Sequence, residues 1–257
     1  MRIPLPNWQF RRSIKLVSII LGIVGIIGFT GKKHSERTCQ KINVEILNDD
    51  LNHFVDENDV VILLGDTTIN PVTGKPLGQL NTRLLEQRLK KNCPYIEDVQ
   101  VSYSLGGDLL VRLKQVRPIA RLVRNLGRDY YLCANEAMVP VSNKFTARVL
   151  VIDGATTQLL KQDSVSLERF QEAYRLVTQI SANDLLSKLI VQATVDNNGE
   201  YILYPQISRQ QIMLGRPDNL ENKLARLEAF YNKIIPAKGW DTYQKVSLKF
   251  DNQIVCE

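Results

Sequence analysis

The sequence predicts an α+β protein with a single N-terminal transmembrane helix, a strand–helix–helix–strand–strand domain, and a second domain in which helices cover an antiparallel sheet. Three observations support this fold class. Residues 16–31 form an apolar run without a charged side chain. Several later segments alternate apolar and polar residues, which is the period of strands, and others repeat apolar residues at the period of a helix.

The apolar run at residues 16–31 predicts an uncleaved membrane anchor. It contains 16 residues, slightly fewer than the roughly 20 of a full span, but the Lys15 ammonium can bend back to the lipid headgroups. A cleaved secretory signal is the competing interpretation, although Phe29 is too bulky for its cleavage site. A twin-arginine export signal around Arg11 and Arg12 is a further alternative.

The orientation of this anchor is not decided by charge, because four basic residues precede the run and four follow it. The free amino group favours a cytoplasmic N-terminus. We therefore expect a cytoplasmic tail at residues 1–15, the transmembrane helix at 16–31 and a linker at 32–38. The cysteines follow the anchor and number four, which leaves disulfides and buried thiols as alternatives. They are Cys39, Cys93, Cys133 and Cys256.

Local signals place the elements of the first domain after the linker. Alternating apolar residues predict a strand over residues 42–46. Asp56 is suited to cap a short helix that Gly65 ends. Asn81 begins a second helix, and Cys93-Pro94 stops it. Two further alternating segments flank Gly106-Gly107-Asp108, which predicts a hairpin; they cover residues 99–103 and 109–113.

The second domain is expected to begin near Pro118 with short strands and one helix. The helix starts at Ser166 and places Leu167, Phe170, Tyr174 and Val177 on one side. A turn signal at residues 196–199 predicts another hairpin. The expected strands are residues 119–123, 130–132, 147–152, 189–195 and 201–204.

The clearest helix of the second domain follows Pro217. Asp218 and Glu221 have the spacing of a capping box, and Pro236 is expected to end the helix. Its apolar side is predicted to contain Leu220, Leu224, Leu227 and Tyr231. A strand at residues 243–250, a turn at Asp251-Asn252 and a short return strand at 253–256 complete the sheet.

Composition and motifs argue against several function classes. The two histidines, His34 and His53, have no partner at metal-ligand or catalytic-triad spacing. No nucleophile elbow, zinc-protease, phosphate-loop or CxxC motif occurs, so we expect no cofactor. Cys133 is best interpreted as a packing residue. The net charge is +6, but basic and acidic residues are interspersed, which is typical of solvated helices and not of nucleic-acid binding.

Seven segments, taken in order along the chain, match the pattern of a known family: residues 54–60, 80–89, 111–121, 130–132, 138–142, 147–151 and 246–255. The ordered elements after the anchor resemble a POTRA domain, and through these segments the whole chain resembles the FtsQ/DivIB family of bacterial cell-division proteins, in the form found in Bacteroidetes-like bacteria. The likeness covers nearly the whole chain. Each segment is weak alone, and Cys133-Ala134-Asn135 departs from the acidic residue and glycine usual there.

The resemblance implies a POTRA domain at residues 39–117 and an FtsQ-type β domain at 118–257. It implies a non-enzymatic divisome scaffold in the inner membrane, with a periplasmic body at the division septum. The implied partners are small coiled-coil proteins of the FtsB and FtsL type, which such a scaffold links to septal peptidoglycan synthesis. Rival hypotheses are a component of outer-membrane assembly or secretion, which normally has repeated POTRA units, and a membrane-anchored enzyme.

We expect the partner to bind at the last long strand. If this strand is a sheet edge, its outer backbone groups can pair with an added strand of the partner. Its lysines either pair with acidic partner residues or protect the edge from aggregation. The predicted partner-binding residues are Tyr243, Lys245, Val246, Ser247, Leu248, Lys249 and Phe250.

Overall fold

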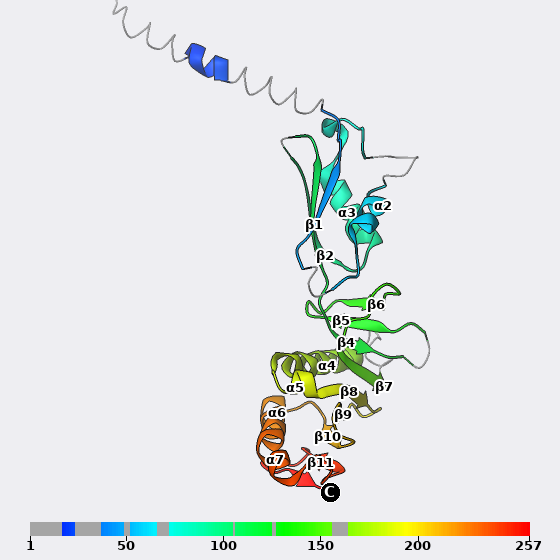
Figure 1. The fold of residues 1–257 in the computed structure, drawn as a ribbon, viewed down its shortest axis with the longest axis vertical. Coiled ribbons are helices and arrows are strands. Elements are labelled where there is room, and N and C mark those ends of the chain that lie inside the picture. Colours follow the sequence, from blue (N-terminus) through cyan, green and yellow to red (C-terminus); the bar gives the residue numbers. More distant parts are fainter. Residues whose placement is uncertain are drawn as a thin grey trace, which may run out of the picture. The chain divides into compact units, whose positions relative to one another are not determined.

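The computed structural model describes residues 17–23, 37–48, 52–65, 72–104, 106–124, 127–155 and 164–257. The chain forms two compact units, which divide between Gln115 and Val116. Residues 52–54, which the sequence placed in the first domain, cluster with the second unit. Figure 1 shows the elements of each unit, and each unit is described by itself.

Most of the predicted transmembrane segment lies outside the described residues, as do the 1–15 tail, most of the 32–38 linker and His34. Residues 17–23 are helical, and their side chains are exposed. Among the described helices, none combines the length and the apolar character that crossing a bilayer requires.

The first unit contains a three-stranded sheet and two main helices, in the predicted order. The central strand β3 (Leu109–Gln115) pairs in parallel with β1 (Ile42–Ile46) and antiparallel with β2 (Ile96–Tyr103). The predicted hairpin is thereby confirmed. The helices are α2 (Glu57–Leu64) and α3 (Thr82–Asn92), with a short 3₁₀ turn η1 (Leu77–Gln79) before α3.

The helix boundaries of this unit follow the sequence signals. Asp56 caps α2 in a capping box with Asp59, and Gly65 ends the helix in the left-handed conformation at φ 82°. Asn81 caps α3 by accepting a hydrogen bond from the Leu84 amide, and Cys93 ends it. These predictions are confirmed because each depends on residues within one helical turn of the boundary.

One edge of the small sheet is covered by a side chain. The Val101 N–H of β2 donates to Glu86 Oε1 of α3 over 2.8 Å. The Tyr103 hydroxyl of β2 donates to the carbonyl oxygen of Leu80, which precedes α3, and Lys90 of α3 pairs with Asp98 of β2 at 2.8 Å. The helix thus satisfies a backbone donor that an edge strand otherwise leaves open.

The second unit is built on a nine-stranded sheet of order β12-β11-β10-β9-β8-β7-β4-β5-β6. Five neighbouring pairs are antiparallel and three are parallel, so the predicted antiparallel sheet is in fact mixed. The strands are β4 (Pro118–Leu122), β5 (Tyr130–Cys133), β6 (Met138–Pro140), β7 (Leu150–Gly154), β8 (Ile190–Val195), β9 (Tyr201–Pro205), β10 (Gln211–Gly215), β11 (Lys245–Ser247) and β12 (Val255–Cys256).

Helical crossovers explain two of the parallel pairs. Residues 164–189 connect β7 to β8, and residues 220–238 connect β10 to β11. Two strands that are joined by a helical connection of this length enter the sheet in the same direction. The crossover elements are α4 (Ser164–Ala182), α5 (Leu186–Leu189), α6 (Leu220–Ala229), the π-helical segment η3 (Phe230–Ile234) and α7 (Ile235–Lys238).

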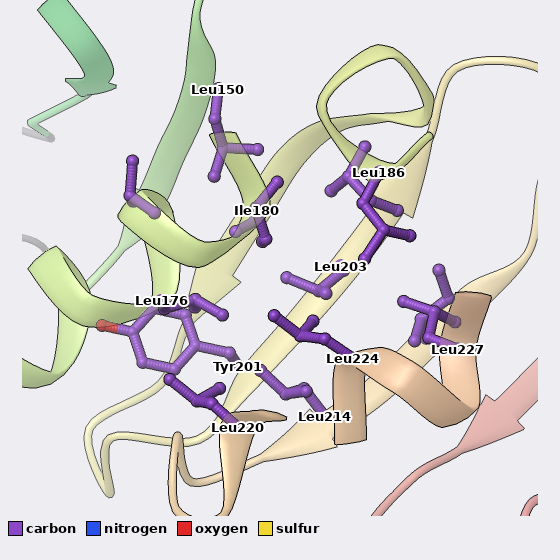
Figure 2. Close-up of a cluster of buried hydrophobic side chains, with 14 of the residues drawn as sticks. Leu150, Leu176, Ile180, Leu186, Tyr201, Leu203, Leu214, Leu220, Leu224 and Leu227 are labelled. Carbon is purple, nitrogen blue, oxygen red and sulfur yellow. The ribbon is translucent and has the colours of Figure 1, made fainter. Parts of the chain in front are cut away.

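The core of the second unit lies between the sheet and these helices. Leu176 and Ile180 of α4, Leu203 of β9 and Leu224 of α6 point into one apolar cluster (Figure 2). All four are at most 6% exposed. Burying a leucine side chain contributes about 2 kcal/mol, so this cluster holds the crossover helices against the sheet.

Several predicted helix details in this unit are wrong. Helix α4 begins at Ser164, before the expected cap Ser166, and Leu167 is 62% exposed. Helix α6 begins after Asn219, in the left-handed conformation, and has no side-chain cap. Pro236 does not end the helical segment, because it occupies the first turn of α7, where proline needs no N–H partner.

Two further differences concern Asp218 and the start of β7. Asp218 accepts a hydrogen bond from Lys223 instead of capping the helix. Strand β7 starts at Leu150 and not at Ala147, because the Ala147 N–H donates to the Tyr131 hydroxyl over 3.1 Å. In the first case the Lys223 ammonium of α6 takes the carboxylate, and in the second the Tyr131 hydroxyl of β5 takes the amide.

Candidate partner-binding edge

The predicted last strand is not an edge of the sheet. Strand β11 pairs in parallel with β10, with Val246 opposite Ile212. On its other side it pairs antiparallel with β12, with Val246 opposite Cys256. The expectation that residues 243–250 offer an open backbone is therefore wrong at β11, and the edge strand at this end is β12.

The predicted turn at Asp251-Asn252 and the return strand are confirmed, and together they cover β11. Asn252 adopts the left-handed conformation at φ 57°, which asparagine tolerates better than most residues. The Lys245 N–H donates to the Glu257 carbonyl oxygen over 3.0 Å, and the Glu257 N–H donates to the Lys245 carbonyl oxygen over 2.9 Å. This reciprocal pair anchors β12 on β11.

The predicted partner-binding residues divide between the core and the surface. Val246 and Leu248 are completely buried, and the Tyr243 ring packs against Phe230 with centroids 6.1 Å apart. These three stabilise the unit. Lys245 is exposed, and Phe250 is 51% exposed.

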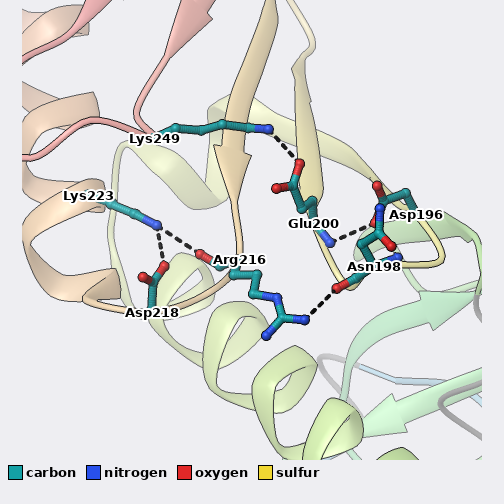
Figure 3. Close-up of polar contacts among 7 residues, drawn as sticks. All are labelled: Asp196, Asn198, Glu200, Arg216, Asp218, Lys223 and Lys249. Carbon is teal, nitrogen blue, oxygen red and sulfur yellow. Dashed lines mark hydrogen bonds and ion pairs between the residues drawn. The ribbon is translucent and has the colours of Figure 1, made fainter.

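The remaining lysine already has an internal partner. Lys249 Nζ lies 2.5 Å from Glu200 Oε2 in the β8–β9 hairpin, as Figure 3 shows. Its stem also lies against Gly215, where an added Cβ would stand 3.1 Å from Lys249 Cγ. Lys249 therefore ties the chain after β11 to the body of the sheet, whereas Lys245 has no ion pair with another described residue.

One arginine holds the turn between β11 and β12. Arg226 Nη1 on α6 donates to the carbonyl oxygens of Phe250 and Gln253, and Nη2 donates to that of Leu248 over 3.2 Å. The Arg226 Nε is buried without a hydrogen-bond partner among the described residues. The guanidinium therefore fixes the path by which the chain returns to form β12.

A buried lysine fixes the connection from β10 to α6. Lys223 is only 5% exposed, and its ammonium donates to the Arg216 carbonyl oxygen over 2.8 Å and to Asp218 (Figure 3). The hydrogen bond from Lys223 holds the pKa of Asp218 below its usual value, against the opposing effect of burial. Sequence reasoning missed both Lys223 and Arg226, because on a helical wheel each resembles a solvated surface residue.

The outer side of β12 is open. Since residue 257 bonds inward to β11, the alternation of an antiparallel ladder directs the N–H and C=O groups of Ile254 and Cys256 outward. Their side chains pack against the core, whereas Val255 is 36% exposed. In the described part of the chain these outward backbone groups have no hydrogen-bond partner.

The described residues also bear on the requirements of a metal site and of a reactive cysteine. Among them, no group of three or more histidine, cysteine or acidic residues is arranged to hold a metal ion. The four cysteines are all described, and no disulfide joins them. Burial raises the pKa of the Cys256 thiol, which makes this edge cysteine a weaker nucleophile at neutral pH.

Comparison with known proteins agrees with the two-unit architecture. A model of a POTRA-like domain matches residues 37–114, the region of the three-stranded sheet with its two helices. The family model described as FtsQ/DivIB, C-terminal related, matches residues 117–257.

Because this second match covers more than half of the chain, the protein belongs to the FtsQ/DivIB family. No curated protein sequence matches it. The family consists of non-enzymatic scaffolds of cell division, which act through protein–protein interactions.

Proposed function

We propose that this protein is a non-enzymatic divisome scaffold that binds small coiled-coil proteins of the FtsB and FtsL type and links them to septal peptidoglycan synthesis. In this proposal residues 16–31 anchor it in the inner membrane, with the described body on the periplasmic side. The observation that carries the proposal is the open outer side of β12, because an unpaired backbone edge is a binding site for another polypeptide.

The proposed contact is the addition of one extended partner segment to β12. The outward N–H and C=O groups of Ile254 and Cys256 supply main-chain hydrogen bonds. Val255, Ser247 and Lys245 lie next to this edge on the sheet face opposite the buried Val246. Lys245 is available to pair with an acidic partner residue, so the sequence-predicted site contributes through its exposed side chains.

A proline at position 256 tests this contact by removing one outward backbone donor. Cys256→Pro deletes the outward N–H and leaves the inward bonds between Lys245 and Glu257 in place. Cys256→Ala is the matched control, because it removes the thiol and keeps the N–H. We expect the full-length proline variant to lose copurification of a coexpressed coiled-coil division protein, and the alanine variant to retain it.

The control for folding is the fluorescence of Trp240, which packs against Tyr231 with ring centroids 5.8 Å apart. A proline variant with native fluorescence and undiminished partner binding would exclude β12 as the docking edge. Leu248→Glu and Ser247→Pro are unsuitable tests, because Leu248 is completely buried and Ser247 pairs with Val255 of β12.

Localisation separates this role from its rival. A fluorescent fusion of the full chain is expected to gather at midcell in dividing cells. A uniform signal around the envelope would instead favour the outer-membrane assembly or secretion role, which the POTRA-like unit also suits.

A further inference from the structure

A hollow of about 400 Å³ lies in the second unit, away from the β12 edge. It is lined by Asn52, Arg117, Pro118, Phe145 and residues 146–149. All of these residues belong to the second compact unit. They cluster around the starts of β4 and β7, and four strands separate β7 from β12 in the sheet.

Two arginines without internal carboxylate partners line the hollow. Arg112 and Arg121 each contact a carboxylate oxygen at 2.6 Å, on Glu45 and Asp129 respectively. Arg117 and Arg148, by contrast, form no ion pair with any described residue, and no acidic side chain lines the hollow. The hollow therefore carries two positive charges that the described part of the protein leaves uncompensated.

The walls of the hollow are held in place. The Arg117 carbonyl oxygen accepts a hydrogen bond from the Ala134 N–H over 2.8 Å, which fixes the backbone that carries this side chain. The Phe145 ring packs edge-on against Phe54 and His53, with centroids 5.0 and 5.6 Å away. The backbone of Arg117 is thus fixed by a hydrogen bond, and the segment that leads to Arg148 is held by the packing of Phe145.

The backbone beside the hollow indicates the kind of ligand. Residues 145–149 have no helical or strand partner, and Ala147 donates only to the Tyr131 hydroxyl. Among the described residues, the backbone groups of Thr146 and Arg148 have no hydrogen-bond partner. Unpaired main-chain groups beside two guanidinium groups suit a polypeptide better than a free anion, because a peptide supplies complementary main-chain donors and acceptors.

We propose that this hollow binds an aspartate or glutamate carboxylate presented by an extended segment of a partner protein. A guanidinium group presents paired donors that match a carboxylate, so two of them can hold both of its oxygens. Pro118, Phe145 and Val149 offer apolar surface to the neighbouring side chains of the segment. This second docking point is independent of strand addition at β12 and does not require the division role.

The test begins with peptide selection on the purified full-length protein in detergent. A phage-displayed library of random heptapeptides is selected on the immobilised protein and, in parallel, on the double variant Arg117→Gln/Arg148→Gln. We expect an acidic residue to be enriched at one position with the unchanged protein and not with the double variant. Arg209→Gln is the matched control, because it removes one exposed charge from the β9–β10 turn.

The best peptide is then labelled with fluorescein and measured by anisotropy. The double variant and a peptide with glutamine in place of the acidic residue are each expected to weaken binding by about tenfold or more, since hydrogen bonds to charged groups are lost. Arg209→Gln is expected to change the affinity less than twofold.

Three outcomes would overturn the proposal while Trp240 fluorescence stays native. The selection could yield no acidic enrichment, or the double variant could bind the peptide within twofold of the unchanged protein. Alternatively, inorganic phosphate or vesicles of anionic lipid could displace the peptide at equal concentrations of negative charge, which would assign the hollow to anions in general or to a membrane surface.

Discussion

The two edges of the nine-stranded sheet differ in the backbone groups that they present outward. At one end, β6 is a three-residue strand that closes with Pro140, which has no N–H to offer. At the other end, β12 is a two-residue strand that presents the N–H and C=O groups of Cys256 without a described partner. A natural sheet is expected to protect both edges from further pairing, and this difference is what supports the proposal that a partner binds at β12.

The side chains that hold each edge strand in place also differ. Near β6, Asp129 accepts hydrogen bonds from Arg121 at 2.6 Å and from the Arg124 N–H at 3.1 Å, and its carbonyl oxygen accepts from Val141. Near β12, Arg226 reaches from a helix to three carbonyl oxygens of the turn. The blunted edge is held by strand neighbours, and the open edge is held by a crossover helix.

The largest loss of stability is expected from removing the Leu248 side chain, which lies beneath the β12 edge. Leu248→Ala should lower the free energy of unfolding of the second unit by about 2–5 kcal/mol, because the leucine is completely buried. The measurement is urea unfolding followed by Trp240 fluorescence in a Trp8→Phe background. Phe250→Ala, at the exposed position two residues on, is the control and should cost about 0.5 kcal/mol or less.

A smaller effect is expected from releasing the turn that Arg226 holds. Arg226→Met keeps the aliphatic stem and removes the donors, which should lower the free energy of unfolding by about 1.5–3 kcal/mol. Hydrogen exchange should accelerate at the Lys245 and Glu257 amides and stay unchanged at Val139 in β6. Equal acceleration at both edges would show that the two supports are not independent.

Near β6, the contribution of Asp129 to the free energy of unfolding should depend on pH. Burial by itself raises the pKa of Asp129, but hydrogen bonds from Arg121 and Arg124 hold that pKa below its usual value. The ionised carboxylate therefore stabilises the fold above the pKa of the unfolded chain, and this contribution is lost as the pH falls through the lower folded pKa. Asp129→Asn should cost about 1–2 kcal/mol at pH 7.

The same comparison of Asp129→Asn with the unchanged protein should give a smaller difference at acidic pH than at pH 7, because protonation of the Asp129 carboxylate removes its charge-assisted hydrogen bonds from Arg121 and Arg124. Urea midpoints at the two pH values check this. A difference that is independent of pH would mean that Asp129 acts through packing and not through its charge.

The smallest effect on stability is expected from replacing Pro140 in the edge strand β6. Pro140→Val restores an outward N–H on β6 and should change the free energy of unfolding by about 0.5 kcal/mol or less, because it touches no fully buried group. Its consequence should appear as concentration-dependent self-association in size-exclusion chromatography. A monomeric Pro140→Val variant would show that proline is not what protects this edge.

Sequence reasoning succeeded where the determinants are local. The Asp56 and Asn81 caps, the Gly65 stop and the Asp251-Asn252 turn all depend on residues within a few positions of the boundary. The two hairpins were likewise predictable. The FtsQ/DivIB resemblance is confirmed by the family match over residues 117–257.

What could not be predicted depends on residues that are distant in the sequence. The parallel pairing of β10 with β11 joins positions that are more than 30 residues apart. The return strand was expected, but only the register of Val246 against Cys256 reveals that it covers the anticipated edge. Arg226 and Lys223 carry the same local signal as any surface charge, so their roles appear only once the turn and the helix are placed.

The crossover between β10 and β11 has a consequence for the order of folding. Among the described strands β12 pairs only with β11, and α6, η3 and α7 lie between β10 and β11 in the chain. Such a non-local connection forms late, because the entropy cost of closing the loop comes before the contacts that offset it. A molecule that has not finished this step has no β12 edge, so a partner that binds there selects completed copies from nascent ones.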